Sequence, residues 1–164
     1  MNKHTEKFTK TEEEILNFLY LHPTRSFRGR ALAKELKRPA SGVIQSARTL
    51  EKKGLVKVSK DFILSIHLNR YNKKVFTLKR IHNLTSLYES GLVTCLSEEL
   101  PSAAIVLFGS YSYGEDTEES DIDVAVIGYA ERHMSAITKA YEQKLGRHIE
   151  LHFFKSMKEV NENL

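Results

Sequence analysis

The chain has 164 residues, 41% of them hydrophobic and 28% charged, with a formal net charge of +4 and a single cysteine. This composition is typical of a globular protein with one medium-sized domain or two small ones. No apolar run approaches membrane-spanning length, the N-terminus lacks the apolar segment of a signal peptide, and the lone Cys95 excludes an internal disulfide. We therefore expect a cytoplasmic protein without a membrane partner.

The charge is divided unevenly along the chain. Residues 1–90 hold 19 Lys and Arg against 8 Asp and Glu, a balance of +11. Residues 91–164 hold 6 against 13, a balance of −7. Such asymmetry favours two modules, of which the basic one has a polyanionic partner.

The basic half is predicted to form three helices followed by a β-hairpin. Apolar residues recur at helical spacing in three segments, which end at Pro23, at the turn 37–39 and at Gly54. Two short strands, 55–58 and 62–66, follow around a turn at 60–61. The residues expected to cap the three helices are Thr11 with Glu14, Ser26 and Ser41.

This order of elements over residues 8–68 resembles a winged helix-turn-helix domain. The resemblance implies that the third helix enters a major groove of duplex DNA, where Gln and Arg contact base edges and Lys and Ser contact phosphates. RNA is an alternative partner, and a solvated basic face or a protein-docking module is the alternative to nucleic-acid binding. The expected contact residues are Ser41, Gln45, Arg48, Lys52, Lys53, Lys57 and Lys60.

Residues 69–101 carry apolar side chains at helical spacing from Val75 to Leu100, until Pro101 interrupts the pattern. One or two helices are expected here. They would connect the two modules and pack on a sheet, or form the surface of a homodimer.

The acidic half places two carboxylates after a glycine loop. The apolar run 104–108 ends at Gly109-Ser110, ten residues follow, and Asp121 and Asp123 open a second apolar run. Residues i and i+2 of a strand share a face, so both carboxylates would point the same way. Adjacent carboxylates repel each other unless a cation is bound, and Mg²⁺ prefers such oxygen sites, which substrate phosphates complete. The pattern therefore favours metal-assisted attack on a nucleotide phosphate.

The pattern Gly-Ser-x10-Asp-x-Asp resembles the signature of the nucleotidyltransferase superfamily related to DNA polymerase β, and in size its minimal bacterial and archaeal members. The resemblance extends from about residue 103 to the C-terminus, and it implies that both Asp residues bind Mg²⁺ or Mn²⁺. The residues implied to bind the substrate NTP, expected to be ATP, are Gly109, Ser110, Gly114 and Ser120.

The same resemblance implies a third carboxylate on a later strand, and Glu150 is the candidate. A helix at 131–145 precedes it, and residues 148–154 alternate, with His148, Glu150 and His152 on one face. Glu150 would deprotonate the attacking hydroxyl or bind the metal, and an exposed edge-strand glutamate is the alternative. For the two histidines, solvent exposure or hydrogen bonding is expected rather than metal binding.

The loop departs from the family pattern, because Tyr111 and Tyr113 stand where many members carry Arg, and four acidic residues follow. Acidic groups near a triphosphate raise the electrostatic cost of binding it. The two tyrosines would stack on a base, bond a phosphate or merely cover the loop.

The sequence thus predicts an α+β protein with a winged helix at 1–68, a helical linker at 69–101 and a minimal nucleotidyltransferase at 102–164, built on a short mixed β-sheet flanked by helices. The expected function is transfer of a nucleoside monophosphate from an NTP to a nucleic acid end, a protein hydroxyl or a small molecule. The alternative is a DNA-binding transcriptional regulator whose nucleotidyltransferase-like domain only senses nucleotide or mediates oligomerisation.

Overall fold

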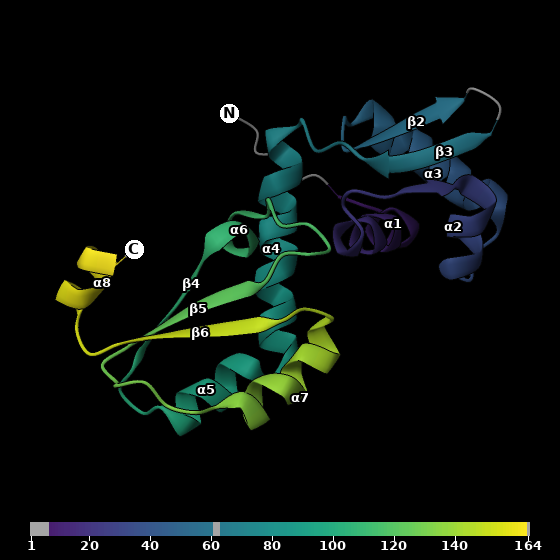
Figure 1. Ribbon diagram of the computed structural model, residues 1–164. Coiled ribbons are helices and arrows are strands. Elements are labelled where there is room, and N and C mark those ends of the chain that lie inside the picture. Colours follow the sequence, from purple (N-terminus) through teal and green to yellow (C-terminus); the bar gives the residue numbers. More distant parts are fainter. Residues whose placement is uncertain (1–6, 61–62, 164) are drawn as a thin grey trace. The chain divides into compact units, whose positions relative to one another are not determined.

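The computed structural model describes residues 7–60 and 63–163 (Figure 1), and the side chains of Lys60 and of residues 161–163 lie outside the description. The chain divides into two compact units, Met1–Val75 and Phe76–Leu164. Each unit combines helices with a three-stranded sheet, which confirms the α+β class. Within the described ranges, no helix combines the length and apolarity needed to cross a membrane.

The first unit has the helix and strand order of a winged helix. Its sheet has the order β1-β3-β2, and both strand pairs are antiparallel. The hairpin β2–β3 corresponds to the predicted wing, although residues 61–62, on which part of the predicted turn falls, lie outside the described residues. The short strand β1 was not predicted. The elements are α1 (Lys10–Leu21), β1 (Ser26–Arg28), α2 (Gly29–Glu35), α3 (Ala40–Lys52), β2 (Val56–Lys60) and β3 (Leu64–Leu68).

The three expected helix caps in this unit are wrong. The Thr-x-x-Glu pattern occurs twice in overlapping positions, and the capping box is formed by Thr9 with Glu12, two residues earlier than expected. Glu14 is instead engaged by the guanidinium of Arg38, at 2.7 and 2.9 Å. Ser26 lies in β1, where its backbone pairs with β3. Ser41 lies inside α3, which follows Pro39 without a side-chain cap.

The second unit contains a mixed sheet of order β4-β5-β6, in which β4 and β5 are antiparallel and β5 and β6 are parallel. The predicted strand 104–108 is confirmed as β4, and the helix expected at 131–145 begins four residues later, at Ser135. Its elements are α4 (Lys73–Ser90), which begins in the first unit, α5 (Leu92–Glu99), β4 (Ala104–Phe108), α6 (Gly109–Tyr113), β5 (Ile122–Ile127), α7 (Ser135–Leu145), β6 (Ile149–Phe154) and α8 (Met157–Asn163).

The two faces of this second sheet differ in how much apolar packing covers them. One face carries the main core of the unit, in which Val124 and Ile149 pack with Leu87 of α4 and with Leu92 and Leu96 of α5. The helices α5 and α7 lie on this side (Figure 1). The opposite face holds a small cluster of Ala125, Ile127 and Phe154, next to which the strands carry polar side chains. The candidate site lies on this second face.

Candidate functional site

Strand register brings the Gly109-Ser110 turn and the carboxylates of Asp123 and Glu150 together at one end of the strands. Phe108, the last residue of β4, pairs with Asp123 of β5, and Asp123 pairs with Glu150 of β6. Because β4 runs antiparallel to β5, the Gly109-Ser110 turn that follows Phe108 meets the beginning of β5. Residues that are 15 and 27 positions apart in the sequence are thus paired.

Gly109 lies directly against the Asp123 carboxylate. Its φ is +67°, and a Cβ placed on it would overlap Asp123 Oδ2 and lie 3.0 Å from Cγ. A left-handed backbone and this close approach both require the absence of a side chain. Glycine therefore keeps open the space in front of the carboxylate.

The Gly109→Ala substitution is expected to displace the Asp123 side chain and to lower the affinity for Mn²⁺ at least tenfold, because the added methyl group takes the position of a carboxylate oxygen. Gly42→Ala is the matched control, since no atom lies within 4 Å of a Cβ placed there. Calorimetric titration of Mn²⁺ into both variants measures the effect. Equal affinities would show that the Gly109 contact does not shape the site.

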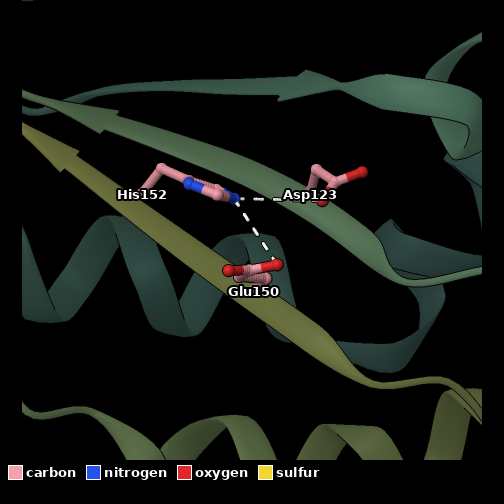
Figure 2. A group of neighbouring side chains, drawn as sticks. All are labelled: Asp123, Glu150 and His152. Atoms are coloured by element: carbon pink, nitrogen blue, oxygen red, sulfur yellow. Dashed lines mark ion pairs between the residues drawn. The ribbon is translucent and has the colours of Figure 1, made fainter. Parts of the chain in front are cut away.

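Three side chains from two strands converge on the exposed face. Figure 2 shows Asp123 of β5 with Glu150 and His152 of β6, whose potential ligand atoms lie within 4.8 Å of one another. The Nε2 atom of His152 is 3.9 Å from Asp123 Oδ1 and 3.9 Å from Glu150 Oε2. The group does not include Asp121, which is exposed and precedes β5 by one residue.

The loop that follows the Gly-Ser turn packs on α4. Gly114 has φ +74°, and a Cβ there would overlap the carbonyl oxygen of Phe76 and lie 2.7 Å from the backbone nitrogen of Arg80. The loop closes in a turn in which the Thr117 N–H donates to Ser120 Oγ at 2.9 Å. Gly114 and Ser120, both expected to bind nucleotide, therefore fix the path of the loop.

A buried ion pair holds the middle of this loop. The Lys79 ammonium pairs with Asp116 Oδ1 and also donates to the Asp116 carbonyl at 3.0 Å, and each side chain is only 1% exposed. Asn83 donates to Asp116 Oδ1 at 2.8 Å and to the Tyr111 carbonyl at 2.9 Å. One of the four loop acids is thus neutralised inside the protein, which weakens the electrostatic objection to a nearby triphosphate.

The structure narrows the alternatives left open for Tyr111. Its side chain is 5% exposed and belongs to the main core, so stacking on a base is excluded for it. Burial raises the pKa of the phenol to about 12, and the nearby Asp116 carboxylate acts in the same direction. Tyr113 is 63% exposed and remains open to a ligand.

Comparison with known proteins finds a family match within the second unit. Residues 89–163 match the family model described as a nucleotidyltransferase domain. This match supports the nucleotidyltransferase superfamily for the C-terminal part of the chain. No curated protein matches the chain significantly.

Among solved structures, the chain is similar to MepR, a transcription regulator of the Staphylococcus aureus multidrug efflux pump MepA. The identity is 27% and the TM-score 0.44, over 57% of this chain and 69% of that one. A possible transcriptional regulator from Methanosarcina mazei Go1 gives 22% identity and a TM-score of 0.38, over 56% and 78% of the two chains. The winged-helix assignment rests on the element order and sheet topology of the first unit itself.

The helix α3 presents a regular exposed face in that unit. Val43, Ala47 and Leu50 are buried, whereas Gln45 and Arg48 between them are exposed. The exposed members of the expected contact set on α3, at helical spacing along one side, are Ser41, Gln45, Arg48 and Lys52.

The other expected contact residues are placed differently. Lys53 Nζ is 3.1 Å from the nearly buried Glu12 carboxylate and lies over the Phe8 ring, so its charge is used within the fold. Lys57 is exposed on β2, with Nζ over the ring of Tyr71 at 4.7 Å. The Lys60 side chain lies outside the described residues.

Proposed function

We propose that the second unit transfers a nucleoside monophosphate from an NTP to a hydroxyl acceptor in a reaction that depends on a divalent metal. The observation that carries this proposal is the pairing of Asp123 with Glu150 directly beside Gly109. These residues lie in a stretch that matches a nucleotidyltransferase family model. In this proposal residues 1–68 direct the enzyme to nucleic acid and 69–101 link the two functions.

The donor atoms in the site fit a cation such as Mg²⁺ or Mn²⁺. Two carboxylates as close as Asp123 and Glu150 repel each other, so a bound cation would stabilise the pair. His152 Nε2 is buried and has no hydrogen-bond partner among the described residues. Asp121 would supply a further oxygen from just before the strand. When bound, the cation neutralises phosphate charge and polarises the reacting phosphoryl group.

The residues of the chain would bind the nucleotide and move one proton. Gly109 and Ser110 begin α6, and their backbone N–H groups are proposed to bind phosphate oxygens of the NTP. The half-exposed Glu150 would accept the proton of the attacking hydroxyl. That hydroxyl oxygen bonds to the α-phosphorus, the bond from this phosphorus to the oxygen bridging to the β-phosphate breaks, and pyrophosphate leaves.

The first unit is proposed to bind duplex DNA through α3 and the wing. The exposed Gln45 and Arg48 have the hydrogen-bonding groups that read base edges, and Lys52 and Lys57 would contact phosphates. The same face supports the second candidate function, a DNA-binding regulator whose second unit senses nucleotide or mediates oligomerisation.

Labelled nucleotides separate the two candidate functions. The purified chain is incubated with α-³²P-labelled ATP, GTP, CTP or UTP and Mg²⁺ or Mn²⁺, with nucleic acid ends, small molecules or a lysate as acceptors. Covalent label on an acceptor, lost in Asp123→Asn, supports the transferase. Saturable nucleotide binding without covalent label would instead support the regulator.

DNA binding by the full chain is expected to fall steeply with salt concentration. Removing a phosphate contact by Lys52→Ala should weaken binding to all sequences and lower the salt slope by about one, whereas Arg48→Ala should relax sequence preference. Lys10→Ala removes the same charge from the exposed side of α1 and is the matched control. Fluorescence anisotropy against a salt series measures these effects. A loss equal to that of Lys52→Ala in the control would show that only net charge matters.

A further inference from the structure

His152 is the one member of the site cluster for which the sequence predicted no metal. It lies two residues beyond Glu150 on β6, on the same face of the sheet, and its register partner on β5 is Ala125. Because the Ala125 side chain is only a methyl group, it leaves room for the imidazole of His152 to extend across the sheet toward Asp123, which is its diagonal neighbour. The imidazole therefore extends toward the carboxylate pair.

The orientation of the ring is set by a second neighbour. The Phe108 and His152 rings meet edge to face, with centroids 5.1 Å apart and an interplanar angle of 66°. Phe108 is itself fixed at the end of β4, in register with Asp123. The ring is thus held so that Nε2 faces both carboxylates (Figure 2).

Within the described part of the molecule, the Nε2 atom of His152 has no hydrogen-bond partner. It is shielded from solvent and makes no hydrogen bond, although buried polar atoms normally find a partner. Its separation of 3.9 Å from each carboxylate oxygen is too long for a hydrogen bond. An ion that binds all three groups would satisfy the nitrogen and both carboxylates at once.

We propose that His152 Nε2 is a metal ligand together with Asp123 and Glu150, and that this nitrogen makes the site prefer Mn²⁺ or Co²⁺ over Mg²⁺. Mg²⁺ favours oxygen ligands, whereas affinity for imidazole rises along the first-row transition metals. The inference rests on the metal site of the proposed function but not on the transfer reaction. It adds a nitrogen to a donor set that the sequence predicted to consist of carboxylates.

The test compares metal binding by the full chain and by two histidine variants. His152→Gln removes the inferred ligand, and His148→Gln is the matched control, because His148 is exposed on the same segment and its Nδ1 contacts Glu142 instead. Calorimetry with Mn²⁺, Co²⁺ and Mg²⁺ is expected to show a loss of at least tenfold for Mn²⁺ and Co²⁺ in His152→Gln, with Mg²⁺ affinity changed less than threefold. His148→Gln should match the wild type.

Pulsed electron paramagnetic resonance of bound Mn²⁺ detects the ligand directly. A ¹⁴N coupling from imidazole is expected in the wild type and in His148→Gln, and its absence is expected in His152→Gln. Circular dichroism of each variant is the check that it is folded.

The inference is overturned if Mn²⁺ binds the wild type without ¹⁴N coupling. It is also overturned if His152→Gln retains or increases Mn²⁺ affinity, which would mean that the imidazole only screens the carboxylates. Nitrogen coupling without nucleotidyl transfer would leave the inference standing and remove the proposed function. Nucleotidyl transfer without nitrogen coupling would support the proposed function and overturn the inference about His152.

Discussion

Replacing Lys79 with methionine is expected to lower the free energy of unfolding of the second unit by about 3–5 kcal/mol. The substitution keeps the apolar stem but leaves the Asp116 carboxylate 1% exposed and without its closest cation. Asn83 donates one hydrogen bond, and the nearly buried Arg147 remains as a longer ion-pair partner at 3.6 Å, so the carboxylate is compensated only in part. A buried charge without a close counter-charge is strongly destabilising, even where the intact pair adds little net stability.

Urea unfolding followed by circular dichroism, with hydrogen exchange of residues 76–164 to isolate the second unit, measures this loss. Lys139→Met removes the same group from the exposed surface of α7 and should change stability by no more than about 0.5 kcal/mol. The double variant Lys79→Met with Asp116→Leu should recover part of the stability, because it removes the incompletely compensated carboxylate but leaves the nearly buried Arg147 without its partner. Equal effects of Lys79→Met and Lys139→Met would contradict the buried ion pair.

The Asp123→Ala substitution is expected to abolish metal-dependent NTP binding without unfolding the protein. Asp123 is the side chain that both Gly109 and the Glu150–His152 pair approach, so its loss removes the centre of the inferred metal site. Its side chain is partly exposed and carries no core packing, and its removal relieves repulsion from Glu150. The melting temperature of the metal-free chain should therefore be unchanged or slightly raised.

Calorimetry with Mn²⁺ and a non-hydrolysable ATP analogue measures the binding. The control Glu119→Gln removes one negative charge from an exposed position of the loop that precedes β5. This variant should bind Mn²⁺ and the nucleotide analogue as the wild type does. If the heats of the wild type equal those of Asp123→Ala, the metal site does not exist.

In the second sheet, two strands could be predicted from the local pattern of apolar residues. The apolar run 104–108 and the alternation over 148–154 correspond to β4 and β6, because one face of each strand packs against the main core. The spacing of the Gly-Ser and Asp-x-Asp segments also implied that they meet. The meeting of Asp123 with Glu150 follows from parallel pairing of β5 and β6, which alternation alone does not specify.

Features that depend on distant partners were not predictable in the same way. The strand β1 has only three residues and exists because it pairs with β3, about forty residues later in the chain. Asp116 looked like one of several loop acids, because nothing local reveals that Lys79 is buried beside it. The approach of His152 to Asp123 depends on the small Ala125 opposite and on the ring of Phe108. These contacts exist only once the strands are aligned.

The anchoring of the loop between the Gly-Ser turn and β5 has a consequence for its tolerance of insertions and deletions. Residues 109–113 form α6, Gly114 abuts the backbone of α4, Asp116 is fixed by Lys79, and residues 117–120 close a hydrogen-bonded turn. Each consecutive segment of the loop is therefore held by a contact of its own, and no segment without such a contact is left to accommodate an added or lost residue. Side chains at exposed positions such as Glu115 and Glu119 can be exchanged freely, whereas the number of residues between Ser110 and Asp121 cannot change without moving one of these anchors.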